Sequence, residues 1–303
     1  MKLSVIIPVY RGKKILYELI RRISNTLDKR FDHEILLISD GCDTESLKAI
    51  NELARVNPDK INVFRLARNY GQHRALQYGF SKASGDLIVT LDEDLQHDPG
   101  DILKLVEKQK EGNFDIVYGR FSNPQHNGIR NVISSLLRKT LKHFIPDLYD
   151  NYSPYRLIKR DIASRITAMV SPYTFIDDFL SRITQNIGFV DISHSKRMEG
   201  KSSYTFRKLL MHGIFIFLAY SRIVSWLLIV SILIMTTGSI LYITNIVRAD
   251  YLNREFLNNL SIIEIFGTGL FFMVISLLGT LVNNRNMKMN KRPMKLFQDQ
   301  EVL

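Results

Sequence analysis

Cysteine and tryptophan are nearly absent from this 303-residue chain, which has one of each. The single cysteine, Cys42, excludes an internal disulfide framework and a zinc site built from several cysteines. Low-complexity and disordered classes are excluded too, because 17 Phe and 13 Tyr supply apolar surface for a packed core. The length corresponds to about two domains by the usual prior.

A secretory signal is also missing from the start of the sequence. The first ten residues carry one lysine and reach Pro8 before an apolar run of signal length can form. We therefore expect most of the chain to stay in the cytoplasm.

Charged residues are missing from residues 223–247. As a helix, this run would be about 38 Å long, which is enough to cross a bilayer with some tilt. A second apolar run, residues 257–282, is broken only by Glu264. Two buried helices of a soluble protein are the alternative, but buried helices rarely lack charge over so long a run. We expect a two-helix transmembrane hairpin over residues 223–282.

Basic residues outnumber acidic ones, 41 to 30, and they cluster on both sides of the predicted hairpin. The connector between the spans holds only Arg248 and Arg254. The positive-inside rule then places both termini in the cytoplasm, including a basic tail over residues 283–303. The flanking basic residues are Lys196, Arg197, Lys201, Arg207 and Lys208 before the hairpin, and Arg285, Lys288, Lys291, Arg292 and Lys295 after it.

Residues 204–222 mix apolar, aromatic and basic side chains ahead of the first span. This pattern is typical of an interfacial amphipathic helix, and anionic lipid is a suitable partner for the excess positive charge. Nucleic acid is not expected as a partner, because the soluble half lacks basic residues interleaved with stacking aromatic residues.

Residues 1–203 alternate between short apolar, β-branched runs and segments of helical spacing. This alternation predicts an α/β domain with a mostly parallel, Rossmann-like sheet covered by helices. Ligands bind such sheets at the carboxyl ends of the strands. The expected strands are Leu3–Val9, Glu34–Ile38, Asn62–Leu66, Leu87–Leu91 and Asp115–Tyr118, and the expected helices are Lys13–Leu27, Glu45–Val56, Gln72–Lys82 and Asp101–Lys110, the last opened by Pro99.

Two carboxylates follow the strand expected at Leu87–Leu91. On an extended segment Asp92 and Asp94 would point the same way, and a hard divalent cation with phosphate oxygens would relieve their repulsion. Gln96 adds an oxygen ligand two residues later. An acidic turn at a strand end is the plain alternative.

Two further strand ends carry polar groups. The turn Asp40–Asp43 could accept hydrogen bonds from a nucleotide, although Asp and Gly also suit a tight turn on their own. In the loop from Arg68 to Ala75, Gly71 allows a close backbone turn and Arg68 could reach a diphosphate. A solvated basic loop is the alternative. We interpret Cys42 as a space-filling residue and His73 as structural.

These motifs occur in a familiar order: Pro8–Tyr10, Ser39–Gly41, Arg68-Asn69-x-Gly-x-x-x-Ala, and Asp92-x-Asp94-Leu-Gln-His. Farther on stands His194-x-x-Arg-x-x-Gly-x-Ser-x-Tyr204. The chain resembles the polyprenyl-phosphate glycosyltransferases of glycosyltransferase family 2, which include dolichol-phosphate mannose synthases and bacterial undecaprenyl-phosphate sugar transferases. The resemblance covers nearly the whole chain, including its two C-terminal spans.

The resemblance implies a GT-A fold and inverting transfer of a sugar from a nucleotide-sugar, with a mild preference for uridine, to a polyprenyl phosphate. Asp94 and Gln96 would ligate Mg2+ or Mn2+. Catalytic roles are implied for Asp94, Arg130, Arg156 and Arg197. The residues implied in donor binding are Pro8, Val9, Tyr10, Asp40, Arg68, Asp92, Glu93 and Arg197, and those implied in acceptor phosphate binding are Arg120, Arg130 and Ser134.

The chain departs from the family pattern around the donor. Arg11-Gly12 stands where Asn-Glu is usual, Ser39 replaces the first Asp of Asp-Asp-Gly-Ser and Cys42 its Ser, and Asp98–Gly100 replaces Pro-Pro-Glu. These changes bear on nucleotide and sugar identity more than on reaction type. A bacterial inner membrane location follows from the resemblance, and a homo-oligomer is left open.

Two other functions compete with this interpretation. A non-catalytic membrane scaffold with a degenerate transferase domain would explain the departures, but the retained carboxylates disfavour it. A processive polysaccharide synthase would need more spans and a Gln-x-x-Arg-Trp motif, whereas the sole tryptophan, Trp226, lies inside the first predicted span.

Overall fold

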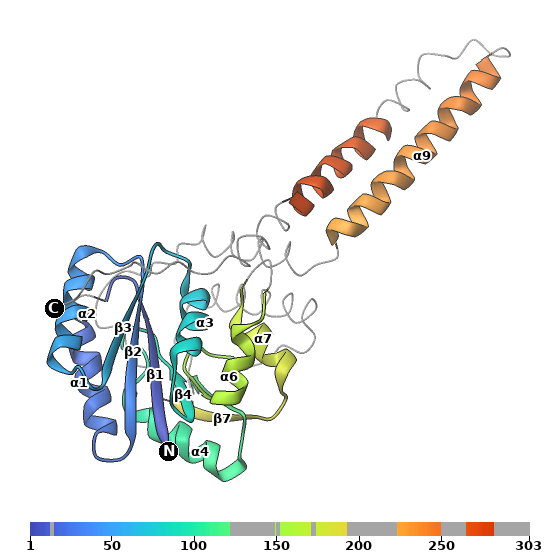
Figure 1. The fold of residues 1–303 in the computed structure, drawn as a ribbon. Coiled ribbons are helices and arrows are strands. Elements are labelled where there is room, and N and C mark those ends of the chain that lie inside the picture. The colour runs from blue at the N-terminus through green and yellow to red at the C-terminus, as the bar shows by residue number, and fades with distance from the viewer. Residues whose placement is uncertain are drawn as a thin grey trace. The chain divides into compact units, whose positions relative to one another are not determined.

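The structure is a computed structural model, and its described residues belong to two compact units. Each unit is treated by itself below. The described residues of the first unit include the whole sheet, and the described residues of the second unit form two helices (Figure 1). The described residues are 1–12, 15–121, 149, 152–170, 174–192, 223–249 and 265–281.

A seven-stranded sheet forms the centre of the first unit, in the order β3-β2-β1-β4-β6-β5-β7. Strand β6 runs antiparallel to both β4 and β5, and the other neighbouring pairs are parallel. This arrangement confirms the predicted mostly parallel α/β sheet. The strands are β1 (Lys2–Val9), β2 (Asp32–Asp40), β3 (Ile61–Leu66), β4 (Leu87–Thr90), β5 (Ile116–Phe121), β6 (Arg156–Lys159) and β7 (Ile187–Ile192).

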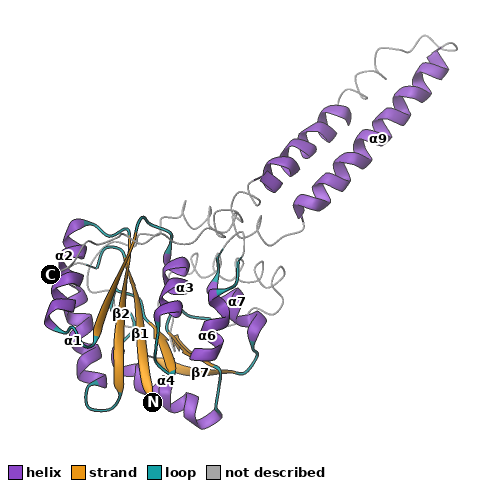
Figure 2. Ribbon diagram, viewed as in Figure 1, coloured by secondary structure: helices purple, strands orange, loops and turns teal. Residues whose placement is uncertain are grey.

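Helices cover both faces of this sheet (Figure 2). Alternate side chains of β1 explain why: Val5 and Ile7 join the apolar cluster of α1, α2 and α4, whereas Ile6 joins that of α3, α6 and α7. The helices are α1 (Ile15–Leu27), α2 (Thr44–Val56), α3 (Gln72–Lys82), α4 (Ile102–Gly112), α6 (Arg160–Thr167) and α7 (Ile176–Ile183), with a 3-10 turn η1 (Pro99–Asp101) before α4.

The predicted elements of the first 121 residues agree with the structure within a few residues, and α3 agrees at both ends. Pro99 lies at the start of η1, as expected for a first-turn proline. The later elements β6, α6, α7 and β7 were not predicted. They are four to eight residues long, too short for their apolar spacing to stand out in the sequence.

The order of the strands creates a switch point at β1. From β1 the chain builds β2 and β3 on one side, then returns to place β4 on the other side of β1. In open α/β sheets, the crevice for a ligand lies outside the carboxyl ends of the strands at such a point. The fold therefore directs attention to the segments that follow β1, β2 and β4.

The second unit contains α9 (Ile223–Ala249) and a helix over residues 265–281. Glycines allow the two helices to pack closely, because a Cβ on Gly238 would lie 2.9 Å from Ile265 and one on Gly269 would lie 2.6 Å from Met235. Large apolar side chains of both helices are exposed, including Trp226 at 61% and Phe271 at 62%.

Within the part of the chain that the structure describes, no helix is found with the length and apolarity that crossing a membrane requires. The predicted transmembrane hairpin is therefore not confirmed. The predicted interfacial helix over residues 204–222 and the basic tail over 283–303 lie outside the described residues.

Candidate functional site

Polar side chains gather where β1, β2 and β4 end. These three strands are parallel neighbours, so their carboxyl ends lie at one edge of the sheet. Tyr10 follows β1, Asp40 is the last residue of β2, and Asp92 comes two residues after β4. The structure thus brings together three residues, Tyr10, Asp40 and Asp92, for which the resemblance implies donor binding.

Glu93 connects the end of β4 to the end of β1. Its two carboxylate oxygens accept hydrogen bonds from the backbone N–H groups of Tyr10 and Arg11, each at 3.1 Å. Burial raises the pKa of Glu93, although these two hydrogen bonds act in the opposite direction. The carboxylate therefore fixes the segment after β1 against the turn after β4.

The predicted extended geometry of Asp92–Asp94 is wrong. Strand β4 ends at Thr90, and the chain turns through Glu93 and Asp94 to Leu95, which has a positive φ of 56°. Asp92 Oδ1 accepts a hydrogen bond from Gln72 Nε2 at 2.6 Å. The carboxylates of the motif consequently sit in a turn, where strand alternation does not govern their directions.

Asp94 and Gln96 lie in this same turn, where Asp94 Oδ1 accepts a hydrogen bond from the backbone N–H of Gln96 at 3.2 Å. No group of three or more His, Cys, Asp or Glu residues suited to a metal occurs among the described residues. One carboxylate and one amide oxygen are, however, hard donors of the kind that Mg2+ or Mn2+ uses when substrate phosphates complete its coordination. The donor set fits a metal shared with a phosphorylated ligand.

Asp40 holds the loop that follows β3. Its buried carboxylate accepts hydrogen bonds from the backbone N–H groups of Tyr70 at 2.6 Å and Gly71 at 2.8 Å. Burial raises the pKa of Asp40 against the effect of those bonds. Gly71 has a φ of +91°, as its predicted role in a close turn requires. Asp40 thus fixes the loop after β3 against the end of β2. Its predicted contact with a nucleotide stays a prediction.

Two arginines stack on tyrosines in the segments that follow β1 and β3. The guanidinium carbon of Arg11 lies 5.0 Å from the centre of the Tyr10 ring, and that of Arg68 lies 4.9 Å from the centre of the Tyr70 ring. Tyr10 remains 38% exposed. Pro8 and Val9 precede it as the last two residues of β1. Planar groups suited to a nucleoside and cations suited to a diphosphate are therefore present at this edge.

Cys42 and His73 have the structural roles that the sequence predicts. Cys42 Sγ donates to the backbone oxygen of Val9 at 3.0 Å, and burial raises the pKa of the thiol to about 11. His73 Nδ1 accepts a hydrogen bond from the N–H of Ile176 at 3.4 Å, and its ring packs edge-on against Phe175. Cys42 thus ties the turn after β2 to the end of β1, and His73 ties α3 to the start of α7.

Arg156 is 1% exposed and lies in β6, paired with the buried carboxylate of Asp177 at the start of α7. Tyr118 Oη donates to the same carboxylate at 2.8 Å. In this structure Arg156 ties β6 to α7, and its predicted place beside a reacting centre stays a prediction. The sequence reasoning missed Asp177 and Gln72, because each acts through a partner distant in the sequence.

Arg120, predicted to contact an acceptor phosphate, is exposed and pairs with Asp191 of β7 at 2.5 Å. The other residues predicted for the acceptor and the diphosphate are not described by the structure. These are Arg130, Ser134 and Arg197.

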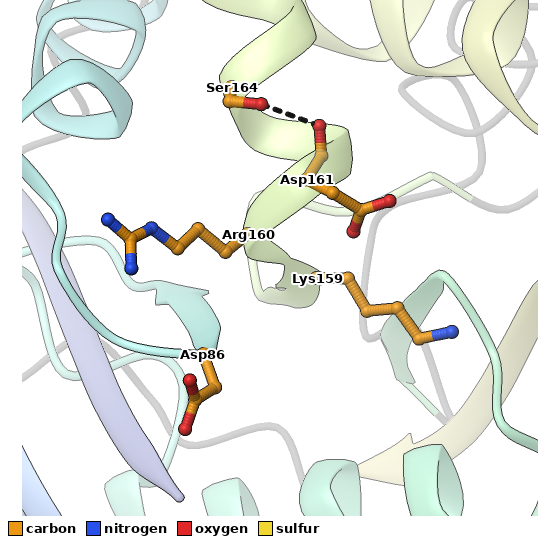
Figure 3. Close-up of a pocket in the computed structure, with 5 residues that line it drawn as sticks. All are labelled: Asp86, Lys159, Arg160, Asp161 and Ser164. Carbon is orange, nitrogen blue, oxygen red and sulfur yellow. Dashed lines mark hydrogen bonds between the residues drawn. The ribbon is translucent and has the colours of Figure 1, made fainter.

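A pocket elsewhere on the first unit is lined by Asp86, Lys159, Arg160, Asp161 and Ser164 (Figure 3). Asp86 directly precedes β4, whereas Asp92 follows it, so this pocket lies at the opposite end of the strand from the predicted site. None of the predicted site residues lines it. It is separate from the edge described above.

Comparison with known sequences identifies a family. The model for glycosyl transferase family 2 matches residues 4–167. Proteins named undecaprenyl-phosphate 4-deoxy-4-formamido-L-arabinose transferase are 32% identical over 211 residues in Proteus mirabilis, 34% over 213 in Klebsiella pneumoniae and 36% over 213 in an Enterobacter species. Each match covers 69% of this chain and 64% of the relative, so the chain spans less than two thirds of the length of these relatives.

Comparison with solved structures supports the same fold. Glucosyl-3-phosphoglycerate synthase from Mycobacterium tuberculosis, solved with Mn2+, UDP-glucose and phosphoglyceric acid, matches with a TM-score of 0.55 and 15% identity, over 72% of this chain and 78% of that one. The same enzyme with Mg2+ and UDP matches with a TM-score of 0.53. At this level of identity, the likeness concerns the fold.

Proposed function

Because the chain belongs to glycosyl transferase family 2, we propose that it is an enzyme that transfers a sugar from a nucleotide-sugar to a polyprenyl phosphate. The relatives named as undecaprenyl-phosphate sugar transferases support this acceptor. The product would be a lipid-linked sugar that serves as a donor in the modification of cell-envelope glycans.

The donor site of this proposal is the edge where β1, β2 and β4 end. The observation that carries it is the convergence of Tyr10, Asp40 and Glu93 at the switch point of the sheet, where α/β folds bind nucleotides. We propose a UDP-sugar as the donor, since the neighbouring fold has been solved with UDP-glucose. Pro8, Val9 and Arg68 belong to the segments that line the same edge.

We propose that Asp94 and Gln96 hold Mg2+ or Mn2+ together with the donor's diphosphate. A bound divalent cation would neutralise charge on the departing nucleoside diphosphate. Asp92 contributes from the same turn, with its carboxylate held by Gln72.

A lipid phosphate as acceptor reduces the demand for a general base. A phosphate monoester has its second pKa at about 6, so it is largely dianionic at neutral pH and already nucleophilic. The difficulty is the approach of this dianion to an anionic donor. We propose that Arg120, Arg130 and Ser134 bind the acceptor phosphate, that Arg197 offsets charge on the diphosphate, and that the sugar is transferred with inversion. We propose Arg156, a buried residue of β6, as a further positive charge beside the reacting centre.

We propose that the second unit attaches the enzyme to the bacterial cytoplasmic membrane with both termini in the cytoplasm. Exposed apolar side chains on α9 and on the helix over residues 265–281 support contact with lipid. A membrane location suits the acceptor, because a polyprenyl chain stays in the bilayer and only its phosphate reaches the enzyme.

The experiment is to incubate the purified protein with undecaprenyl phosphate, Mg2+ or Mn2+ and a panel of nucleotide sugars, and to identify lipid products by mass. We expect one sugar to give a product whose mass equals that of the acceptor plus one glycosyl group. No product from any donor would favour the non-catalytic scaffold instead. A product that keeps adding sugars would favour a processive synthase.

A further inference from the structure

Gly12, three residues after β1, has no room for a side chain. It is not among the described glycines with positive φ, which are Gly41 and Gly71. A Cβ at position 12 would lie 2.7 Å from Glu93 Oε2 and 2.6 Å from Leu16 Cγ. Such distances are below those at which carbon atoms pack, so a side chain here would displace its neighbours.

The carboxylate that fills this space is held firmly in position. Glu93 reaches it from the turn after β4 and accepts hydrogen bonds from two successive backbone N–H groups, those of Tyr10 and Arg11. Hydrogen bonds from backbone N–H groups to a carboxylate are of the stronger, charge-assisted kind. Moving the carboxylate would therefore also release the segment that carries Tyr10 and Arg11.

That segment presents a planar surface at the edge of the sheet. The exposed part of the Tyr10 ring and the Arg11 guanidinium, 5.0 Å from its centre, form a cation–π pair. Aromatic rings and guanidinium planes are the groups on which nucleobases stack. Arg11 and Gly12 are also among the positions at which this chain departs from the family pattern.

We propose that Glu93 is a positioning residue for the donor's nucleoside, and that Gly12 is the glycine whose missing side chain makes room for it. Glu93 fixes the Tyr10–Arg11 segment so that its planar groups meet the nucleobase. The family pattern has an acidic residue at position 12. In this chain Glu93, in the turn after β4, supplies the carboxylate instead. This inference rests on the proposed function, since it takes the ligand to be a nucleotide.

A double-mutant cycle tests the proposal on the whole 303-residue chain in detergent. The variants are Glu93→Ala, Gly12→Ala and the double variant, and the measurement is the Kd for UDP in the presence of Mn2+. We expect each single variant to raise the Kd about tenfold, and the double variant to bind no more weakly than about the worse single variant. The contact with Leu16 is present in both backgrounds and cancels in the cycle.

Independent effects would multiply to about a hundredfold in the double variant, and that result would overturn the pairing of Glu93 with Gly12. If the unaltered protein binds neither UDP nor GDP, the proposed function itself fails. If the unaltered protein binds UDP and the effects of the two substitutions on the Kd multiply, only this inference is refuted and the proposed function stands.

Two controls separate positioning from folding. Glu107→Gln removes an exposed carboxylate on α4, and Gly267→Ala adds a Cβ with no neighbour within 4 Å on the helix over residues 265–281. Both should leave the Kd unchanged. Glu93→Gln keeps the shape but turns an amide NH2 toward a backbone N–H, so we expect weaker UDP binding, measured at a temperature well below the thermal unfolding midpoint of the variant. Unchanged UDP binding in Glu93→Gln would contradict the proposal even if Gly12→Ala fails to fold.

Discussion

Gln72 Nε2 donates a hydrogen bond to Asp92 Oδ1 at 2.6 Å and so joins the first residue of α3 to the turn after β4. The two residues are 20 positions apart in the chain. Because Asp40 also holds the loop before α3 through Tyr70 and Gly71, that loop and helix are tied to the ends of both β2 and β4. The candidate donor site is therefore one connected structure and not a set of separate turns.

Replacing Gln72 should remove the hydrogen bond that holds the Asp92 carboxylate in position. A hydrogen bond to a charged but solvent-accessible group contributes roughly 1 kcal/mol, so Gln72→Ala should lower kcat/KM for the donor about threefold to tenfold. Gln72→Glu should lower it further, because two carboxylates would then face each other. Gln185→Ala, which removes a hydrogen bond to a backbone oxygen in α7, is the matched control. Equal rates in all three variants would contradict this role of Gln72.

Asp177 should matter for stability through Arg156. Removing one partner of a buried ion pair leaves an uncompensated charge and typically costs about 3–5 kcal/mol. Asp177→Ala should therefore lower the denaturant midpoint of the sheet-containing unit strongly. Asp191→Ala, which breaks the exposed pair with Arg120, should leave that midpoint nearly unchanged. Similar midpoints for the two variants would show that the Arg156–Asp177 pair is not a structural element.

Glu34 should make the fold sensitive to acid. Burial acts to raise its pKa, but hydrogen bonds from Ser4 and Ser84 and the charge of Lys2 outweigh burial, and the pKa is lowered from its ordinary value of 4.5. The carboxylate therefore stabilises the fold above pH 4.5, and this stability is lost as the pH falls through the lowered value.

The measurement is the unfolding midpoint as a function of pH. In Glu34→Gln we expect a lower midpoint at pH 7 and a smaller further loss below pH 4.5 than in the unaltered protein. Parallel curves for the two proteins would contradict the assignment.

Cys42 should be slow to react. Because the pKa of the thiol is raised to about 11, little thiolate exists at pH 8. The thiol also donates a hydrogen bond to the backbone oxygen of Val9. Alkylation by iodoacetamide, followed by mass, should be slow at pH 8 in the folded protein and fast after denaturation. Rapid labelling of the folded protein would mean that the thiol is accessible and ionised.

Much of the donor edge could be predicted from the sequence, because strand ends carry their polar residues next to them in the chain. Asp40, Gly71 and the Asp92–Asp94 motif were found in this way. Their directions could not be predicted, since Asp92 and Asp94 lie in a turn and Asp40 bonds to the backbone of a distant loop. The role of Glu93 depends on the proximity of β1 and β4, which spacing along the chain does not reveal.

The buried contact between Arg156 and Asp177 could not be predicted from the sequence for a related reason. Arg156 and Asp177 are 21 residues apart and belong to a short strand and a short helix. A buried arginine is rare unless it is paired, and its partner becomes apparent only when β6 is found between β4 and β5.

The dependence of sugar transfer on a divalent cation bound through Asp94 tests the central claim most directly. The rate of lipid-linked product formation is measured against Mn2+ concentration for the unaltered protein and for Asp94→Ala, with Glu107→Ala, which removes an exposed carboxylate on α4, as the control. The proposal predicts a saturable rise with Mn2+ in the unaltered protein and in the control, and loss of that rise in Asp94→Ala. Near-normal, metal-dependent turnover in Asp94→Ala would contradict it.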